Sequence, residues 1–405
     1  MNTALLQRAP LAVIVIAQLF GTSLWFSING VWFSLSGELG LSESDLGRLT
    51  LSVQAGFITG TLILATTGLA DRFPASRIFA LASLLGALTN AGFIIAAPHA
   101  GLDAAVRFLT GLCLAGIYPL GMKMVIAWTP AYAGAALSWL VGMLVLGTAT
   151  PHLMRGLTLG LPWEWALLGA SGLTLLGGLF ILRLGDGPHL PSTAGPIALR
   201  GGLEALRIPE FRAAAGGYFG HMWEVYAAWM LMPLLVAREI ARLDASPALI
   251  PILSYLVIGI GLVGCIIGGQ ISRSRGSAWV AGRALGLSGS LCLIYPLLAI
   301  LGAPPMLLLA LLFLWGLALA ADSPQFSALA SANAPQHRVG ASLAIMNTIG
   351  FGLSIPAIWL TSHLWTTQGP SVLIWLLPGP VLGLWALHWQ PAAPRNGADW
   401  FKSEP

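Results

Sequence analysis

The segment Phe108-Leu-Thr-Gly-Leu-Cys-Leu-Ala-Gly-Ile-Tyr-Pro119 recurs about two hundred residues later as Phe313-Leu-Trp-Gly-Leu-Ala-Leu-Ala-Ala-Asp-Ser-Pro324. Seven of the twelve positions are identical and in the same register, and both copies lie within long apolar runs. An apolar helix repeated in each half of a hydrophobic chain is typical of transporters built from two similar bundles. The copies differ in charge, because Asp322 belongs to the second whereas Arg107 and Lys123 flank the first.

The composition excludes a soluble globular domain, because 57% of the 405 residues are hydrophobic and only 8% are charged. A membrane-spanning helix needs about 20 mainly apolar residues. The apolar runs are continuous and do not alternate with period two, which predicts helices and not a barrel. Twelve such stretches are predicted, at approximately 11–33, 46–68, 76–97, 102–126, 134–154, 163–183, 212–236, 249–271, 278–300, 304–330, 340–363 and 370–390.

Several function classes lack support in the sequence. The three cysteines, Cys113, Cys265 and Cys292, lie within predicted spans, so neither a disulfide framework nor a metal site is indicated. The sequence has no Gly-rich nucleotide-binding loop and no nucleophile–His–acid grouping. We therefore expect neither an enzyme nor a bound cofactor. The net charge of +4 arises from loop residues and does not predict nucleic-acid binding.

Loop charges predict the orientation of the chain. With the amino terminus placed in the cytoplasm, the inner loops and tails hold twelve of the 19 Lys and Arg residues and the outer loops hold four. This bias fits the positive-inside rule and predicts that both termini are cytoplasmic, in the plasma (inner) membrane. Pro188, Pro191 and Pro196 mark the longest non-apolar stretch. The predicted division is an amino-terminal six-helix bundle at 1–183, a cytoplasmic linker at 184–211, a carboxyl-terminal six-helix bundle at 212–390 and a cytoplasmic tail at 391–405.

The loop after the second predicted span, Gly68-Leu-Ala-Asp71-Arg72-Phe-Pro-Ala-Ser-Arg77, resembles the signature of the major facilitator superfamily between the same two helices. A degenerate echo ending in Arg273 falls at the matching place in the second half, and Arg107-Phe-Leu-Thr-Gly111 resembles the helix-4 motif of that family. The resemblance implies an all-α integral membrane fold in which two six-helix bundles are related by a pseudo-two-fold axis. It also implies a conformational-gate motif, assigned here to Gly68, Asp71, Arg72, Arg77 and Arg273.

The resemblance further implies that helices 1, 4, 7 and 10 line a central cavity. The sequence concentrates intramembrane polar residues on these four helices, and those on helix 1 fall on one face. The predicted substrate-cavity residues are Gln18, Thr22, Trp25 and Asn29 on helix 1, Arg107, Tyr118 and Lys123 on helix 4, Trp223 on helix 7 and Gln325 on helix 10.

Two acidic residues, Glu224 and Asp322, lie well inside predicted spans, and His221 is one helical turn from Glu224. A charged group at the bilayer centre costs about 2.5–3.5 kcal/mol on insertion scales, so it needs a partner, a water-filled cavity or a proton. Removal from water disfavours the charged form of a carboxyl group, which lets it exchange protons near neutral pH. We therefore predict that Glu224, Asp322 and His221 are proton-coupling residues.

These observations predict a monomeric secondary active transporter of a small organic solute, coupled to protons and working by alternating access. Arg107 and Lys123 suggest an anionic solute, and we expect them to pair across the cavity with acids of the second bundle in the empty carrier. One alternative is a polyspecific drug/proton antiporter, although helix 5 lacks the Gly-Pro pair of that group's signature. Another is a non-transporting receptor or scaffold, for which the tails are short.

Overall fold

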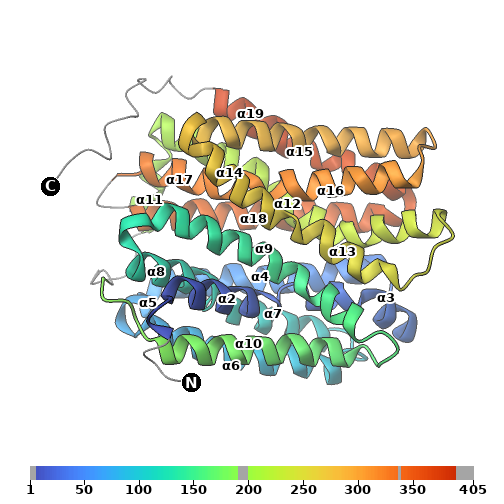
Figure 1. Cartoon of the computed structure of the whole chain (residues 1–405), viewed down its shortest axis with the longest axis horizontal. Helices are drawn as coiled ribbons and strands as arrows, with labels where there is room; N and C mark the ends of the chain where they lie inside the picture. The colour runs from blue at the N-terminus through green and yellow to red at the C-terminus, as the bar shows by residue number, and fades with distance from the viewer. Residues whose placement is uncertain (1–5, 190–198, 336–338, 389–405) are drawn as a thin grey trace.

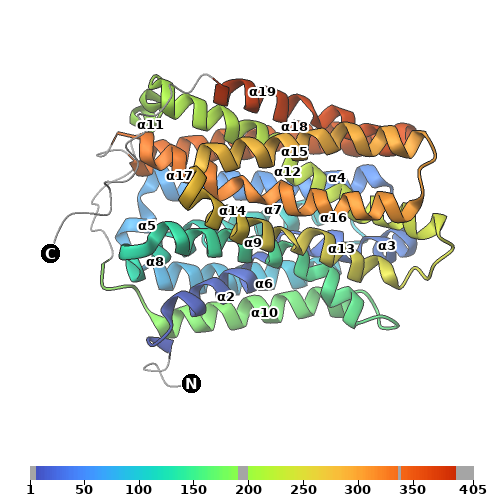
Figure 2. The same cartoon turned by 45° about the horizontal axis from the view of Figure 1, so that its top comes forward.

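The computed structural model describes residues 6–189, 199–335 and 339–388. The chain forms two packed helical bundles, one from each half of the sequence, with their helices running along the long axis of the molecule (Figure 1). Figure 2 shows the same two halves from a second direction. The predicted tail, 391–405, and part of the predicted linker fall outside the described residues.

The first bundle comprises nine α-helical segments of the described chain, several of which are halves of one membrane span. They are α2 (Pro10–Thr22), α3 (Ser27–Leu39), α4 (Glu43–Thr67), α5 (Leu69–Arg72), α6 (Ala75–Ala96), α7 (Leu102–Leu114), α8 (Tyr118–Trp128), α9 (Ala133–Leu157) and α10 (Glu164–Leu184).

The second half begins with the short helix α11 (Leu199–Ala205), which lies inside the predicted linker. The remaining elements form the second bundle. They are α12 (Pro209–Arg242), α13 (Leu249–Gly259), α14 (Gly261–Arg275), α15 (Ser277–Ile300), α16 (Pro305–Ala321), α17 (Ser323–Asn333), α18 (Val339–Gln368), the 3₁₀ segment η3 (Gly369–Leu376) and α19 (Pro378–His388).

Ten helical segments among the described residues are long and apolar enough to cross a membrane. One of them, Val339–His388, is 50 residues long, which is enough for two membrane crossings. The first crossing is α18 and the second is η3 together with α19. The helix α12 is 34 residues long but is too polar to meet the same criterion. With Val339–His388 counted as two spans and α12 added to the ten, the total is the twelve spans that the sequence predicts.

The repeated segment folds in the same way in both bundles. In each copy the helix is interrupted just before the repeated proline, between α7 and α8 at Pro119 and between α16 and α17 at Pro324. Each proline lies in the first turn of the following half-helix, where its missing N–H is tolerated.

The repeated glycine brings two helices into backbone contact in each bundle. A Cβ on Gly111 would collide with the backbone of Val53 in α4, and a Cβ on Gly316 would collide with the backbone of Val257 in α13. Glycine is therefore required at both positions for α4 to pack on α7 and for α13 to pack on α16.

Helices α5, α8, α11 and α17 lie at one end of the molecule, called the α5 end, and α3 and α13 lie at the other, called the α3 end (Figure 1). At the α5 end, Gly68 ends α4 and precedes α5 with φ of 66°, a left-handed conformation that suits glycine. This explains the glycine of the predicted gate motif.

Candidate functional site

A small central cavity lies between the two bundles. It is about 30 Å³ in volume, which is room for one or two water molecules. Its walls come from α8 and α9 of the first bundle and from α12, the α16–α17 break and α18 of the second. The lining residues are Tyr118, Val141, Leu144, Val145, Tyr218, His221, Met222, Val225, Tyr226, Trp229, Ala320, Ser323 and Phe351.

One wall of the cavity carries a buried pair formed by His221 and Asp322. Nδ1 of His221 lies 2.9 Å from Oδ1 of Asp322, and the two side chains are 3% and 1% exposed. The approach is close but does not have hydrogen-bond geometry, and neither carboxyl oxygen of Asp322 has another hydrogen-bond partner among the described residues. The helix break at Asp322 places this carboxyl group against α12, next to the cavity-lining Ser323.

The second predicted acid, Glu224, points away from the cavity into the second bundle. Its Oε1 accepts hydrogen bonds from Ser288 and Cys292 of α15 and from Nε1 of Trp315 of α16, the last at 2.8 Å. Its Oε2 has no hydrogen-bond partner among the described residues. Glu224 thus connects three helices of one bundle, and it is not among the residues that line the cavity.

Arg107 is also buried within a single bundle. Its guanidinium donates to the carbonyl oxygens of Leu24 and Trp25, the closer at 2.7 Å, and to Oγ of Ser27 at 3.0 Å. The carbonyls belong to the interruption between α2 and α3, where a helix break leaves backbone acceptors without helical partners. Its planar fork of donors suits several acceptors at once. Arg107 therefore stabilises the broken first span, and it has no carboxylate partner among the described side chains.

The sequence pattern of the Major Facilitator Superfamily matches residues 13–358, most of the chain. The chain belongs to the major facilitator superfamily. A search of curated proteins finds no match to the sequence.

Solved structures of superfamily transporters share the fold. The crystal structure of a D-xylose-proton symporter aligns over 94% of this chain and 96% of its own, with a TM-score of 0.72 at 15% sequence identity. A bacterial homolog of the human lysosomal transporter Spinster, in an inward-facing and unoccupied conformation, aligns over 95% of this chain and 94% of its own. Its TM-score is 0.63 at 14% identity. At these identities the likeness concerns the fold alone.

The residues that line the cavity in the described part of the chain include none from the first span. The superfamily resemblance had predicted that this span lines the cavity. Gln18 packs against Gly121 of α8, and Thr22 packs against Gly147 of α9. Asn29 donates to Thr50 of α4. Helices α9 and α18 supply cavity walls in its place. Except for Trp25, the polar stripe of helix 1 is therefore used for packing between helices of its own bundle.

The remaining predicted site residues fall in different places. Tyr118 lines the cavity, and Gln325 is buried one turn after the Asp322 break. Lys123 donates from Nζ to the carbonyl oxygen of Ala70 in α5 at 2.6 Å. Trp223 donates to the carbonyl oxygen of Trp375 in η3. Lys123 and Trp223 thus lie away from the cavity.

The gate motif lies at the α5 end of the molecule. Its side chains Arg72 and Arg77, and Arg273 of the second-half echo, are exposed. The carboxylate of Asp186, just after α10, accepts hydrogen bonds from the backbone of Ala75 and Ser76 at the start of α6. The sequence analysis did not predict these two hydrogen bonds. Both of their determinants can be read from the sequence, since Asp186 follows a predicted span and the span that begins at Ser76 has no capping side chain before it.

A second feature that sequence reasoning missed is an aromatic cluster toward the α3 end of the cavity. The ring of Trp25 lies 4.6 Å from Phe57, 5.4 Å from Tyr226 and 5.9 Å from Phe351 between centroids. The first two of these four residues belong to the first bundle, and the others to the second. Aromatic pairs stabilise by about 0.5–1.5 kcal/mol beyond their buried area, so the cluster holds the bundles together here.

A buried hydrogen bond crosses between the bundles beside this cluster. Nε1 of Trp25 donates to Oε1 of Gln54 at 3.1 Å, and Nε2 of Gln54 donates to Oγ of Ser354 in α18 at 2.8 Å. Gln54 and Ser354 are both fully buried. The bond therefore connects the first span, through α4, to the opposite bundle.

Replacing Ser354 with alanine should favour conformations that are open at the α3 end. The change leaves the Gln54 amide buried without an acceptor, which costs about 1–3 kcal/mol, and about 1.4 kcal/mol is a ten-fold shift in population. Spin labels at Gly37, which has free space around it, and at exposed Thr366 should report a longer separation. Thr348→Val is the matched control, since that hydroxyl bonds only within its own helix. Equal distance distributions for all three proteins would contradict the role of this bond.

Proposed function

We propose that this protein is a proton-coupled secondary active transporter of a small organic solute that works by alternating access. The observation that carries the proposal is the His221–Asp322 pair on the wall of a cavity between two bundles. The superfamily fold supports transport in general. We further propose that the α5 end faces the cytoplasm of a plasma-membrane protein and that the protein is a monomer.

The pair can take up and release one proton as the cavity opens first to one side of the membrane and then to the other. A lone ionised carboxyl group that is fully buried carries a desolvation cost of several kcal/mol, which a proton or a protonated imidazole offsets. Histidine is the side chain whose ordinary titration lies nearest to physiological pH. Because His221 lines the cavity and contacts Asp322, the proton has a route between the acid and the cavity. We assign coupling to this pair in preference to Glu224, which lies behind it.

The chemistry of the cavity favours a neutral or positively charged solute over an anion. No Lys or Arg is among the described residues that line it, and Arg107 is occupied by backbone carbonyls. Five aromatic rings are in the lining, and aromatic faces attract organic cations. This observation favours the alternative of a polyspecific antiporter for amphipathic compounds over the transport of an anion. The cavity is smaller than any such solute, so binding requires the bundles to separate.

Proteoliposomes containing the purified protein test this function directly. A pH gradient imposed across the vesicle should drive a solute gradient, and adding solute to vesicles without a gradient should move protons. Aromatic amines, quaternary ammonium compounds, neutral sugars and carboxylates make up a suitable panel. Solute movement that never responds to a pH gradient, or proton movement that no solute evokes, would contradict proton coupling.

The loop at the α5 end should control the rate of the conformational cycle and leave solute affinity largely unchanged. Asp71 belongs to the motif that the superfamily resemblance assigns to gating, and the motif is far from the central cavity. Asp71→Asn should therefore lower the turnover number several-fold while the dissociation constant stays within about two-fold, a change near 0.4 kcal/mol. Transport rates in vesicles and equilibrium binding in detergent separate the two quantities. A large loss of affinity at an unchanged rate would refute the assignment.

A further inference from the structure

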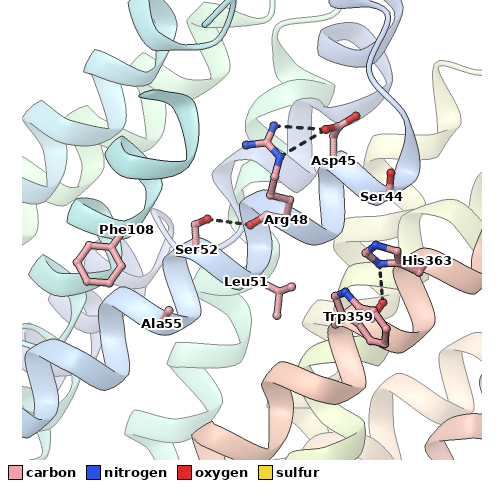
Figure 3. Close-up of a pocket in the computed structure, with 9 residues that line it drawn as sticks. All are labelled: Ser44, Asp45, Arg48, Leu51, Ser52, Ala55, Phe108, Trp359 and His363. Carbon is pink, nitrogen blue, oxygen red and sulfur yellow. Dashed lines mark hydrogen bonds and ion pairs between the residues drawn. The ribbon is translucent and has the colours of Figure 1, made fainter. Parts of the chain in front are cut away.

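A second cavity of the described structure is separate from the central site. It is a groove of about 510 Å³ on the surface of the molecule, where α4 and α7 of the first bundle meet α18 of the second. Figure 3 shows its lining side chains: Ser44, Asp45, Arg48, Leu51, Ser52, Ala55, Phe108, Trp359 and His363. All nine are at least partly exposed, so the groove opens on the flank of membrane-spanning helices.

The groove changes from polar to apolar along its length. Ser44, Asp45 and Arg48 occupy the first two turns of α4, at the α3 end, whereas Leu51 and Ala55 lie further along the same helix. The hydroxyl of Ser52 is already bonded to the carbonyl oxygen of Arg48. A ligand that fits has a polar head at the α3 end and an apolar tail directed toward the middle of the molecule.

The polar part of the groove has an excess of negative charge. Arg48 binds Asp103 through two hydrogen bonds, at 2.9 and 2.7 Å, and contacts Asp45 at 3.3 Å. One guanidinium therefore faces two carboxylates. Asp103 is 2% exposed whereas Asp45 is 31% exposed, so the surplus negative charge lies at the surface of the groove. This arrangement attracts a positively charged group and disfavours a head that carries only negative charge.

An aromatic pair faces the polar part from the opposite wall. Trp359 is 51% exposed, and its ring lies 4.8 Å from that of His363. Nδ1 of His363 donates to the carbonyl oxygen of Trp359, so Nε2 of the neutral ring is an acceptor. An exposed indole face can hold an ammonium group, and tryptophan is favoured where the headgroup region meets the hydrocarbon.

We infer that this groove binds one zwitterionic phospholipid. Its ammonium group is attracted by Asp45 and the Trp359 ring, its phosphate lies toward Arg48, and one acyl chain lies along Leu51 and Ala55. The groove opens where a membrane supplies such molecules at high local concentration. Because its walls belong to both bundles, the bound lipid acts as a wedge that favours the arrangement of α4 and α18 seen here.

Native mass spectrometry of the full-length protein tests this inference with three probes of identical acyl chains: phosphatidylethanolamine, phosphatidylcholine and phosphatidylglycerol. The wild type should retain one molecule of either zwitterionic lipid in preference to phosphatidylglycerol. Ala55→Phe fills the apolar part and should remove this retained lipid. Ala65→Phe, on the same helix but outside the groove, is the matched control and should keep it.

Asp45→Asn tests the charge argument while keeping an oxygen that can cap α4. Ser42 still has its acceptor, and Arg48 keeps its two bonds to Asp103. The preference for zwitterionic over anionic lipid should fall about five-fold, the scale of one partly exposed charge interaction. Equal retention in Ala55→Phe and Ala65→Phe, an unchanged headgroup preference in Asp45→Asn, or no retained lipid would each overturn the inference. Dimers that Ala55→Phe abolishes would assign the groove to a second copy of the chain and also overturn it.

Discussion

Replacing Asp322 with asparagine is expected to abolish solute gradients that are driven by protons. The amide cannot take up the proton that the His221–Asp322 pair exchanges with the cavity. One pH unit supplies about 1.4 kcal/mol per proton, so one-to-one coupling supports a solute ratio of about ten across the vesicle membrane. In Asp322→Asn this ratio should fall to one, while exchange of labelled for unlabelled solute continues.

Glu224→Gln is the matched control for this experiment, because it makes the same acid-to-amide change in the same bundle. Glutamine keeps the oxygen that accepts from Ser288 and Trp315, and residue 224 does not line the cavity. We expect Glu224→Gln to sustain the solute ratio of the parent protein. The opposite result, with coupling lost in Glu224→Gln and kept in Asp322→Asn, would move the proton site to Glu224.

Removing the guanidinium of Arg107 is expected to destabilise the whole first bundle. Arg107→Met leaves the buried carbonyl of Trp25 without a donor, whereas the carbonyl of Leu24 keeps its bonds from Ser27, so a loss of about 1–3 kcal/mol is expected. Thermal unfolding in detergent measures this loss. Arg183→Met is the control, since Arg183 is exposed and such a change stays within about 0.5 kcal/mol.

The same variant distinguishes two roles for Arg107. An arginine that binds solute would lower affinity in a protein that unfolds at the normal temperature, and that result would contradict the structural role proposed here. The sequence led us to expect Arg107 and Asp322 to pair across the cavity, which predicts non-additive effects on affinity. The structure corrects this, because each has partners in its own bundle. Their combined effects should therefore add within about 0.5 kcal/mol.

The scaffold could be predicted from sequence because it is encoded locally. Continuous apolar runs specify the spans, and the repeated Pro119 and Pro324 mark the two matching helix breaks. The superfamily resemblance leaves a structural role for Arg107 open beside a role in the cavity, but the acceptors of its guanidinium could not be predicted, because the break at Ser23-Leu24-Trp25-Phe26 contains no proline or glycine. Without that break, a buried arginine has no visible acceptors and resembles a ligand for an anion.

The composition of the site depends on contacts between distant helices. Gln54 and Ser354 are 300 residues apart and each is unremarkable alone, yet together they form the buried bond between bundles. A polar stripe on helix 1 predicts a polar environment but not whether that environment is a cavity or a neighbouring helix. Glu224 and Asp322 look alike in sequence, and only the packing of α15 and α16 separates a carboxyl group held within a bundle from one beside the cavity.

The paired close approaches at Gly111 and Gly316 bear on how the two halves of such a chain can diverge. Both halves keep a glycine there, because any side chain larger than a hydrogen atom would collide with the backbone of the neighbouring helix. Positions a few residues away are free of that requirement, and there the second half carries Asp322 where the first has Ile117. The residues needed for folding and those that determine specificity therefore occupy different positions. After a gene duplication, one half can acquire a new functional side chain while both halves keep the glycines that their packing needs.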